Sequence, residues 1–334
     1  MTDERAEKLH TSTAPPNETS RGAFTPWHHR LWGAISDGFF APQPAVNLAI
    51  ARVLLFGFVA QHNYPYERWY KFTEEFWAPV SFFAAWHVPL LVEGVVAMLV
   101  PLLRIVSLSA AMGLAFRWTA PMATVLFWYL KGMQQNFGKV DHADCALALG
   151  LLVLTCSHAG KVWSLPLPKV LRRTPRTEPA KSPEYRWPLQ LILLVIVVMY
   201  FSAGWNKHDR SGWSWALSDN LMRQMLAHEF SRNPPTEIGV FLSGWPLACR
   251  ALGLWSLLVE LLAPLALLHR RLALVMVVNL MALQLGIYLT MGVYFGGMIP
   301  VFLSQLPWYE TWQRLRRRGG VGANVQPETA PFLG

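Results

Sequence analysis

A long uncharged apolar run in the second half of the chain most constrains its fold. From Leu189 to Trp205 the sequence reads LQLILLVIVVMYFSAGW and contains no acidic or basic residue. A helix rises 1.5 Å per residue, so this run is about long enough to cross the hydrocarbon core of a bilayer. Such a segment is typical of a transmembrane helix, and we therefore expect an integral membrane protein.

Further apolar runs indicate that the chain crosses the membrane several times. Hydrophobic residues make up 53% of the chain and charged residues only 15%, a balance typical of multi-pass membrane proteins. The sixteen tryptophans agree with this class, because indole rings favour the headgroup region. We predict an all-α, polytopic helical bundle with about eight transmembrane helices, at residues 45–62, 90–115, 118–131, 143–157, 189–205, 251–268, 272–289 and 291–307.

Clusters of lysine and arginine set the predicted orientation. They are concentrated in the loop from His158 to Trp187 and near the C-terminus, and such basic loops are typical of the cytoplasmic side. With eight spans, both termini lie in the cytoplasm and the protein belongs to the cell (inner) membrane. We predict a disordered or amphipathic segment at residues 1–40, a transmembrane domain with short extracytoplasmic caps at 41–308, and a basic tail at 309–334. The net charge of +9 is explained by these loops, so the lipid bilayer is the expected partner and nucleic acid is not.

Four charged side chains fall inside the predicted spans at least three residues from their ends. They are Arg52, Glu93, Arg104 and Glu260. A charged group in hydrocarbon is energetically costly, so we expect all four to face the interior of the bundle. They either pair with one another or take part in chemistry, and the sequence leaves both interpretations open.

Lys207 directly follows the uncharged run and lies on the predicted extracytoplasmic side. Charged residues at such a position are commonly interfacial anchors, which is one interpretation. The other is a base, because burial at the hydrocarbon edge favours a neutral amine over an ammonium ion. Asp209 opposes this effect if it lies beside Lys207 and not beside His208 or Arg210. His142 opens the fourth predicted span on the same side, where it either anchors the helix or joins Lys207 in catalysis.

Six segments, taken in order, resemble the horizontally transferred transmembrane (HTTM) family, which includes vitamin K-dependent gamma-carboxylase. They are FAPQPAVNLAIARVLLFGF, MGLAFRWTAPMATVLFWYL, VDHADCALALGLLVLTCSHAGKVWSL, YFSAGWNKHDRSGW, LLVELLAPLALLHRR and LQLGIYLTMGVYFGGMIP, within residues 40–308. The resemblance implies that Lys207 is the base that starts oxygenation of a hydroquinone, with His142 as a second catalytic residue. It implies a quinone- or substrate-binding set of Arg52, Asn206, Asp209, Trp213, Glu260 and Gln284.

The cofactors that the resemblance implies are a reduced quinone, such as vitamin K or menaquinone hydroquinone, together with O2 and CO2. No metal is expected, because the three cysteines show no metal-ligand spacing. Gln284 stands where many family members have a histidine, and it can hydrogen-bond a ligand but cannot titrate near neutral pH. Because the chain ends at Gly334, we expect it to lack the large lumenal region with which the carboxylase engages its protein substrate.

Three functional hypotheses follow. The first is a quinol- and oxygen-dependent oxidoreductase or carboxylase-like enzyme that acts on a small or peptidyl substrate. The second is a non-catalytic maturation, immunity or accessory protein for a secreted peptide or metabolite. The third is a protein that binds or transports a lipophilic compound along a path lined by Glu93, Arg104 and Glu260, although the sequence has no sign of the inverted repeats of transporters.

Overall fold

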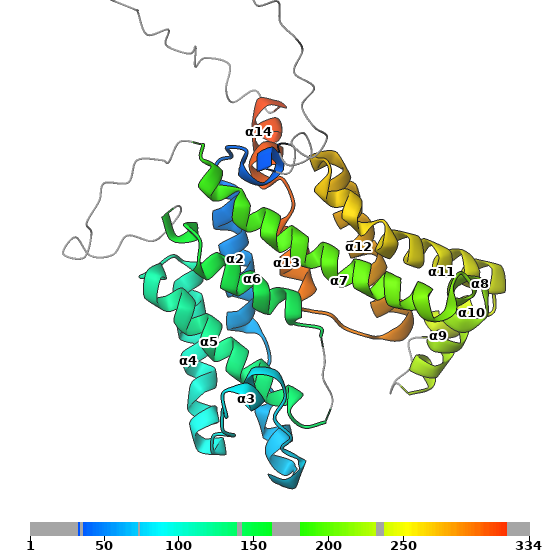
Figure 1. Ribbon diagram of the computed structural model, residues 1–334, viewed down its shortest axis with the longest axis horizontal. Helices are drawn as coiled ribbons and strands as arrows, with labels where there is room; N and C mark the ends of the chain where they lie inside the picture. Colours follow the sequence, from blue (N-terminus) through cyan, green and yellow to red (C-terminus); the bar gives the residue numbers. More distant parts are fainter. Residues whose placement is uncertain are drawn as a thin grey trace, which may run out of the picture.

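Helices account for the regular secondary structure of the part of the chain that the structure describes. The computed structural model describes residues 33, 36–72, 74–138, 142–161, 181–231 and 237–318. Within these ranges the extended chain forms only an isolated bridge between Gln43 and Ser182. The predicted all-α class is therefore confirmed (Figure 1). Most of the predicted 1–40 segment lies outside the described residues.

The main helices overlap the first seven predicted apolar runs. They are α2 (Val46–Gln61), α4 (Glu93–Ala111), α5 (Phe116–Gln135), α6 (Cys145–Thr155), α7 (Trp187–Ser211), α11 (Pro246–Leu261) and α12 (Arg270–Met291). Shorter elements connect or flank them: α3 (Ser81–Ala85), α8 (Ser214–Leu217), α9 (Asn220–Phe230), α10 (Ile238–Ser243), α13 (Met298–Ser304), α14 (Trp308–Arg318), and the 3-10 helices η1 (Tyr66–Lys71), η2 (Glu74–Phe76), η3 (Ala159–Lys161), η5 (Pro183–Tyr185) and η6 (Ala263–Leu267).

Three helical segments among the described residues are long and apolar enough to cross a membrane. They are Glu93–Ala111, Pro183–Ser211 and Arg270–Met291, while Val46–Gln61 and Cys145–Thr155 are apolar but shorter. Large hydrophobic side chains such as Met98 and Ile105 on α4, and Val278 and Leu285 on α12, are exposed on the protein surface. Exposed apolar helix faces of this kind suit contact with lipid, which agrees with a membrane protein. The count of eight spans stays a prediction.

The eighth predicted span, residues 291–307, is not one continuous helix. Apart from Met291, which ends α12, only the seven residues of α13 are helical there, and they extend about 10 Å. Gly292 has φ 65°, a left-handed conformation that ends α12. The next residues form a non-helical connection that lies between α12 and α13 in Figure 1. Apolar composition alone therefore overestimated the length of this helix.

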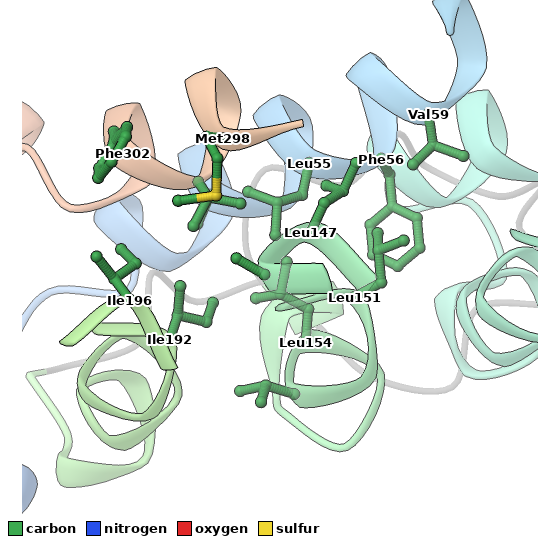
Figure 2. Packing of buried hydrophobic residues seen from close by; sticks show 14 of the residues in the cluster. Leu55, Phe56, Val59, Leu147, Leu151, Leu154, Ile192, Ile196, Met298 and Phe302 are labelled. Carbon is green, nitrogen blue, oxygen red and sulfur yellow. The ribbon is translucent and has the colours of Figure 1, made fainter. Parts of the chain in front are cut away.

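The core lies where α2, α6, α7 and α13 meet. Figure 2 shows side chains from all four helices packed together, and each labelled residue is almost fully buried. Gly150 of α6 permits this packing, since a Cβ atom there would lie 2.8 Å from Leu55 Cδ2. Small residues are common where membrane helices approach closely. The labelled core residues are Leu55, Phe56, Val59, Leu147, Leu151, Leu154, Ile192, Ile196, Met298 and Phe302.

The expectation that all four ionisable residues face the interior is correct for Arg52 and Glu260 and wrong for Glu93 and Arg104. Arg52 and Glu260 are almost fully buried, whereas Glu93 and Arg104 are exposed. The reason is the helical period of α4, whose buried stripe runs through Val96, Val100, Leu103 and Ser107. Glu93 and Arg104 are three turns apart, and both lie outside that stripe.

Candidate functional site

Lys207 lies in the last two turns of α7, where this helix packs against α11. Its Nζ atom donates hydrogen bonds to both carboxylate oxygens of Glu260, at 2.6 Å to Oε1 and 2.7 Å to Oε2. In Figure 1 the end of α7 lies beside α8 and α11. The two residues are far apart in the sequence, and the contact between α7 and α11 brings them together.

Gly204 lets the two helices approach closely enough for this pair. It lies one turn before Lys207 on the same face of α7. A Cβ atom at Gly204 would lie 2.7 Å from Glu260 Cβ and 3.1 Å from the backbone nitrogen of Leu261. Any larger residue at this position would push α11 away and lengthen the ion pair.

Burial makes the Lys207–Glu260 pair more than a surface salt bridge. The Glu260 side chain is 4% exposed and the Lys207 side chain 27% exposed. The ammonium group also lies 4.5 Å from the ring centre of Trp215, within the range of a cation–π interaction. A carboxylate that has left water is strongly stabilised by an adjacent cation, so each member of the pair depends on the other.

Glu260, and not Asp209, is the carboxylate that binds Lys207. Asp209 is exposed, and the described residues show no ion pair between it and Lys207. A carboxylate does stabilise the ammonium form of Lys207, as was considered for Asp209. That carboxylate is Glu260 of α11. The chemistry of Lys207 must be considered together with Glu260.

A second polar contact lies two turns earlier along α7. The side-chain amide of Gln284, on α12, donates a hydrogen bond to the hydroxyl oxygen of Tyr200. The Gln284 Oε1 atom is buried and has no hydrogen-bond partner in the described structure. Tyr200 and Lys207 are seven residues apart, so they share one face of α7 at a rise of about 10 Å. A buried acceptor without a hydrogen-bond donor is uncommon in folded proteins.

His142 is not brought into contact with Lys207 in the described structure. Its exposed ring lies 6.0 Å from the ring of Phe295, in the connection between α12 and α13. Close by in the sequence, Asp144 forms a 2.7 Å ion pair with Lys131 of α5. His142 therefore lies close in sequence to a different charged pair from that of Lys207, and its catalytic role stays a prediction.

The other predicted binding residues on the α7 side are close to Lys207 in sequence but point elsewhere. Asn206 donates a hydrogen bond to the carbonyl oxygen of Ser202, one turn back in α7. Trp213 is exposed and packs edge-on against His208 at 5.3 Å. Neither side chain contacts the Lys207 ammonium.

Arg52 is fully buried in α2 and satisfies backbone carbonyl groups. Its Nε atom donates to the Ala111 carbonyl at 3.0 Å, and its NH1 group donates to the Ala159 carbonyl at 2.6 Å. Ala111 ends α4 and Ala159 begins η3, so these contacts belong to neither α7 nor α11. A cation at a helix C-terminus stabilises the unpaired carbonyl groups there.

Three residues of the site were missed by reasoning from the sequence. Trp215 and Gly204 lie within eight residues of Lys207 in the sequence, but helix packing decides that they contact the pair. Tyr200 lies seven residues before Lys207, and this two-turn spacing was the available signal. Nothing in the sequence identified Gln284 as its partner.

The comparison with protein families shows to which family the chain belongs. The family model of the HTTM domain matches residues 40–301. The chain belongs to the HTTM family. It is thus a membrane protein related to vitamin K-dependent gamma-carboxylase, and the resemblance seen in the sequence is confirmed. No curated protein and no solved structure matches the chain. The HTTM domain contains both members of the Lys207–Glu260 pair.

Proposed function

We propose that this HTTM protein is a quinol- and oxygen-dependent oxidoreductase or carboxylase-like enzyme with Lys207 as its base. The observation that carries the proposal is the Lys207 ammonium held by a nearly buried carboxylate at the end of a membrane-spanning helix. A lipophilic substrate reaches such a position from the bilayer. The acceptor is a small molecule or a peptide.

The residues along α7 fit a reduced quinone in two respects. A hydroquinone offers hydroxyl donors, and the buried Gln284 Oε1 atom is an acceptor without a donor. The ring also requires apolar and aromatic surroundings, and Tyr200 packs against Phe302 with ring centres 6.0 Å apart. When bound, a reduced quinone would supply the electrons for reaction with O2, and CO2 is the co-substrate of a carboxylation.

The Lys207–Glu260 pair is suited to moving one proton. Burial favours the neutral carboxyl form of Glu260, while the adjacent ammonium favours its carboxylate. When the proton resides on Glu260, Lys207 is a neutral amine and can accept a proton at Nζ. When Lys207 accepts this second proton, the pair gains one positive charge, which the substrate anion balances. The charge of the site is conserved in both states.

The test is oxygen consumption by the purified protein in nanodiscs with reduced menaquinone or vitamin K hydroquinone. We expect Lys207→Ala to lower uptake by at least about 100-fold, the usual contribution of general base catalysis. The matched control is Arg250→Ala, which removes an exposed ion pair with Asp219 from the same helix as Glu260. Equal uptake by wild type and Lys207→Ala, with both shown to be folded, would refute the assignment.

A non-catalytic accessory function is the second candidate, and one observation favours it. Both oxygens of Glu260 already bind Lys207, so the pair also has the form of a structural link between α7 and α11. In that case the protein assists the maturation or immunity of a secreted product without turnover. The transport hypothesis is weaker, because Glu93 and Arg104 are exposed and only Glu260 of its three residues is buried.

A further inference from the structure

A cavity lies among the ends of several helices, at the opposite end of α7 from Lys207. Its volume is about 520 Å³, within the usual range for small-molecule sites. Residues from the start of α7, the start of α12, and the segment joining α13 to α14 line it. In Figure 1 these helix ends gather near α14. None of the residues assigned to the Lys207 site lines this cavity.

The lining of the cavity is strongly basic. Among the residues that the structure describes, four arginines line it, Arg186, Arg270, Arg271 and Arg314, against a single acidic residue, Glu310. An arginine cluster around a concave surface is a common way for proteins to bind phosphate groups.

The Glu310 carboxylate in the cavity is already paired. Arg270 forms an ion pair with Glu310, and the side-chain amide of Asn47 donates to Glu310 at 3.3 Å. Burial alone would raise the pKa of the Glu310 carboxyl, but its backbone hydrogen bond and those from Arg270 and Asn47 lower it overall. Among the described residues, Arg271 and Arg314 have no carboxylate partner, so their charge is available to a ligand.

The rest of the lining combines polar residues, such as Gln43, Gln190 and Gln305, with leucines at the ends of candidate membrane-spanning helices. Leu189 and Leu193 belong to the first turns of α7, and Leu274 belongs to the first turns of α12. Both helices are candidate membrane spans. The cavity therefore combines a cluster of arginines with leucine side chains, which suits a phosphate headgroup with its acyl chains attached.

We propose that this cavity binds the phosphate headgroup of an anionic phospholipid, with Arg271 and Arg314 as its main contacts. Basic pockets between membrane helices on the cytoplasmic side are known to hold such headgroups. The preference of basic residues for the cytoplasmic side explains the presence of arginines here but not their gathering around a cavity. The leucine lining favours a lipid over a free phosphate compound. The inference is independent of the reaction proposed for Lys207.

The experiment measures retention of phosphatidylglycerol against phosphatidylcholine by native mass spectrometry of protein purified from mixed vesicles. We expect Arg271→Gln with Arg314→Gln to weaken phosphatidylglycerol binding roughly 25-fold, because each arginine near an anionic surface contributes about a factor of five. Both side chains are exposed, so the fold should persist, and circular dichroism checks this. The matched control is Arg117→Gln with Lys161→Gln, which removes the same charge outside the cavity.

Three results would overturn the proposal. The first is equal phosphatidylglycerol retention by the wild type and the cavity variant. The second is an equal loss in the cavity and control variants, which would indicate a general surface charge effect. The third comes from adding inorganic phosphate or glycerol 3-phosphate at the same phosphate concentration. If either soluble compound displaces the bound lipid as effectively as phosphatidylglycerol vesicles do, the ligand is a soluble phosphate compound.

Discussion

Removing the charge of Lys207 should destabilise the protein far more than removing the charge of an exposed lysine. In Lys207→Met, the Glu260 carboxylate, only 4% exposed, loses its cation. Breaking a fully buried pair from one side costs about 3–5 kcal/mol, and the 27% exposure of Lys207 places this case near the lower limit, at about 3 kcal/mol. Adding Glu260→Gln removes the buried charge as well. We expect the double variant to recover about 2 kcal/mol of that loss.

The assay is a double-mutant cycle measured by unfolding in mixed micelles of dodecyl maltoside and dodecyl sulfate, followed by tryptophan fluorescence. Arg250 and Asp219 provide the matched control, since they form a 3.2 Å ion pair with side chains 44% and 41% exposed. The control cycle should give a coupling energy below about 1 kcal/mol. A coupling of similar size at both pairs would refute the argument that burial makes the Lys207–Glu260 pair strong.

Three other predictions follow from the structure. Gly204→Ala should destabilise the fold by about 1–3 kcal/mol, because its Cβ would overlap α11. Gly286 has open space around it, so Gly286→Ala should be neutral or stabilising by up to about 1 kcal/mol. Unfolding curves of the two variants measure this difference. In a background without native cysteines, Ser182→Cys should be protected from impermeant maleimide in intact cells and Ser218→Cys should be labelled; the reverse would refute the orientation. The lowered pKa of Glu310 means that its contribution to stability is present above about pH 4.3 and is lost as the pH falls through its folded-state pKa. The stability difference between wild type and Glu310→Gln, measured from about pH 3 to 7, should therefore shrink toward acid.

The helices could be predicted from the sequence wherever apolar composition and helix-forming backbone coincide. The predicted span at residues 189–205 begins two residues after α7 does, but α7 continues to Ser211. Polar residues do not end a helix by themselves, and α7 stops only at Gly212, whose φ is 56°. In the predicted span at residues 291–307, glycines interrupt the helix although the composition is apolar. Hydropathy locates a membrane segment, but backbone conformation sets its ends.

The site could be predicted only in part, because a sequence contains candidate residues but not their partners. Lys207 and Glu260 were both predicted, yet their pairing depends on which faces of α7 and α11 meet. That contact is made possible by Gly204, whose role is visible only when the helices are packed. The prediction for Arg104 was wrong. This residue lies within an apolar run and was expected inside the bundle, but it lies on the exposed side of its helix.

The double variant of the first prediction also separates the two functional proposals. Lys207→Met alone removes a base and also destabilises the fold, so its loss of function has two explanations. Lys207→Met with Glu260→Gln restores most of the stability and still has no amine at the site. If the wild type consumes oxygen with a quinol and this stable variant does not, the lysine acts chemically. If the protein retains its biological activity in that variant, the pair serves only to join α7 to α11, and the accessory function is the correct one.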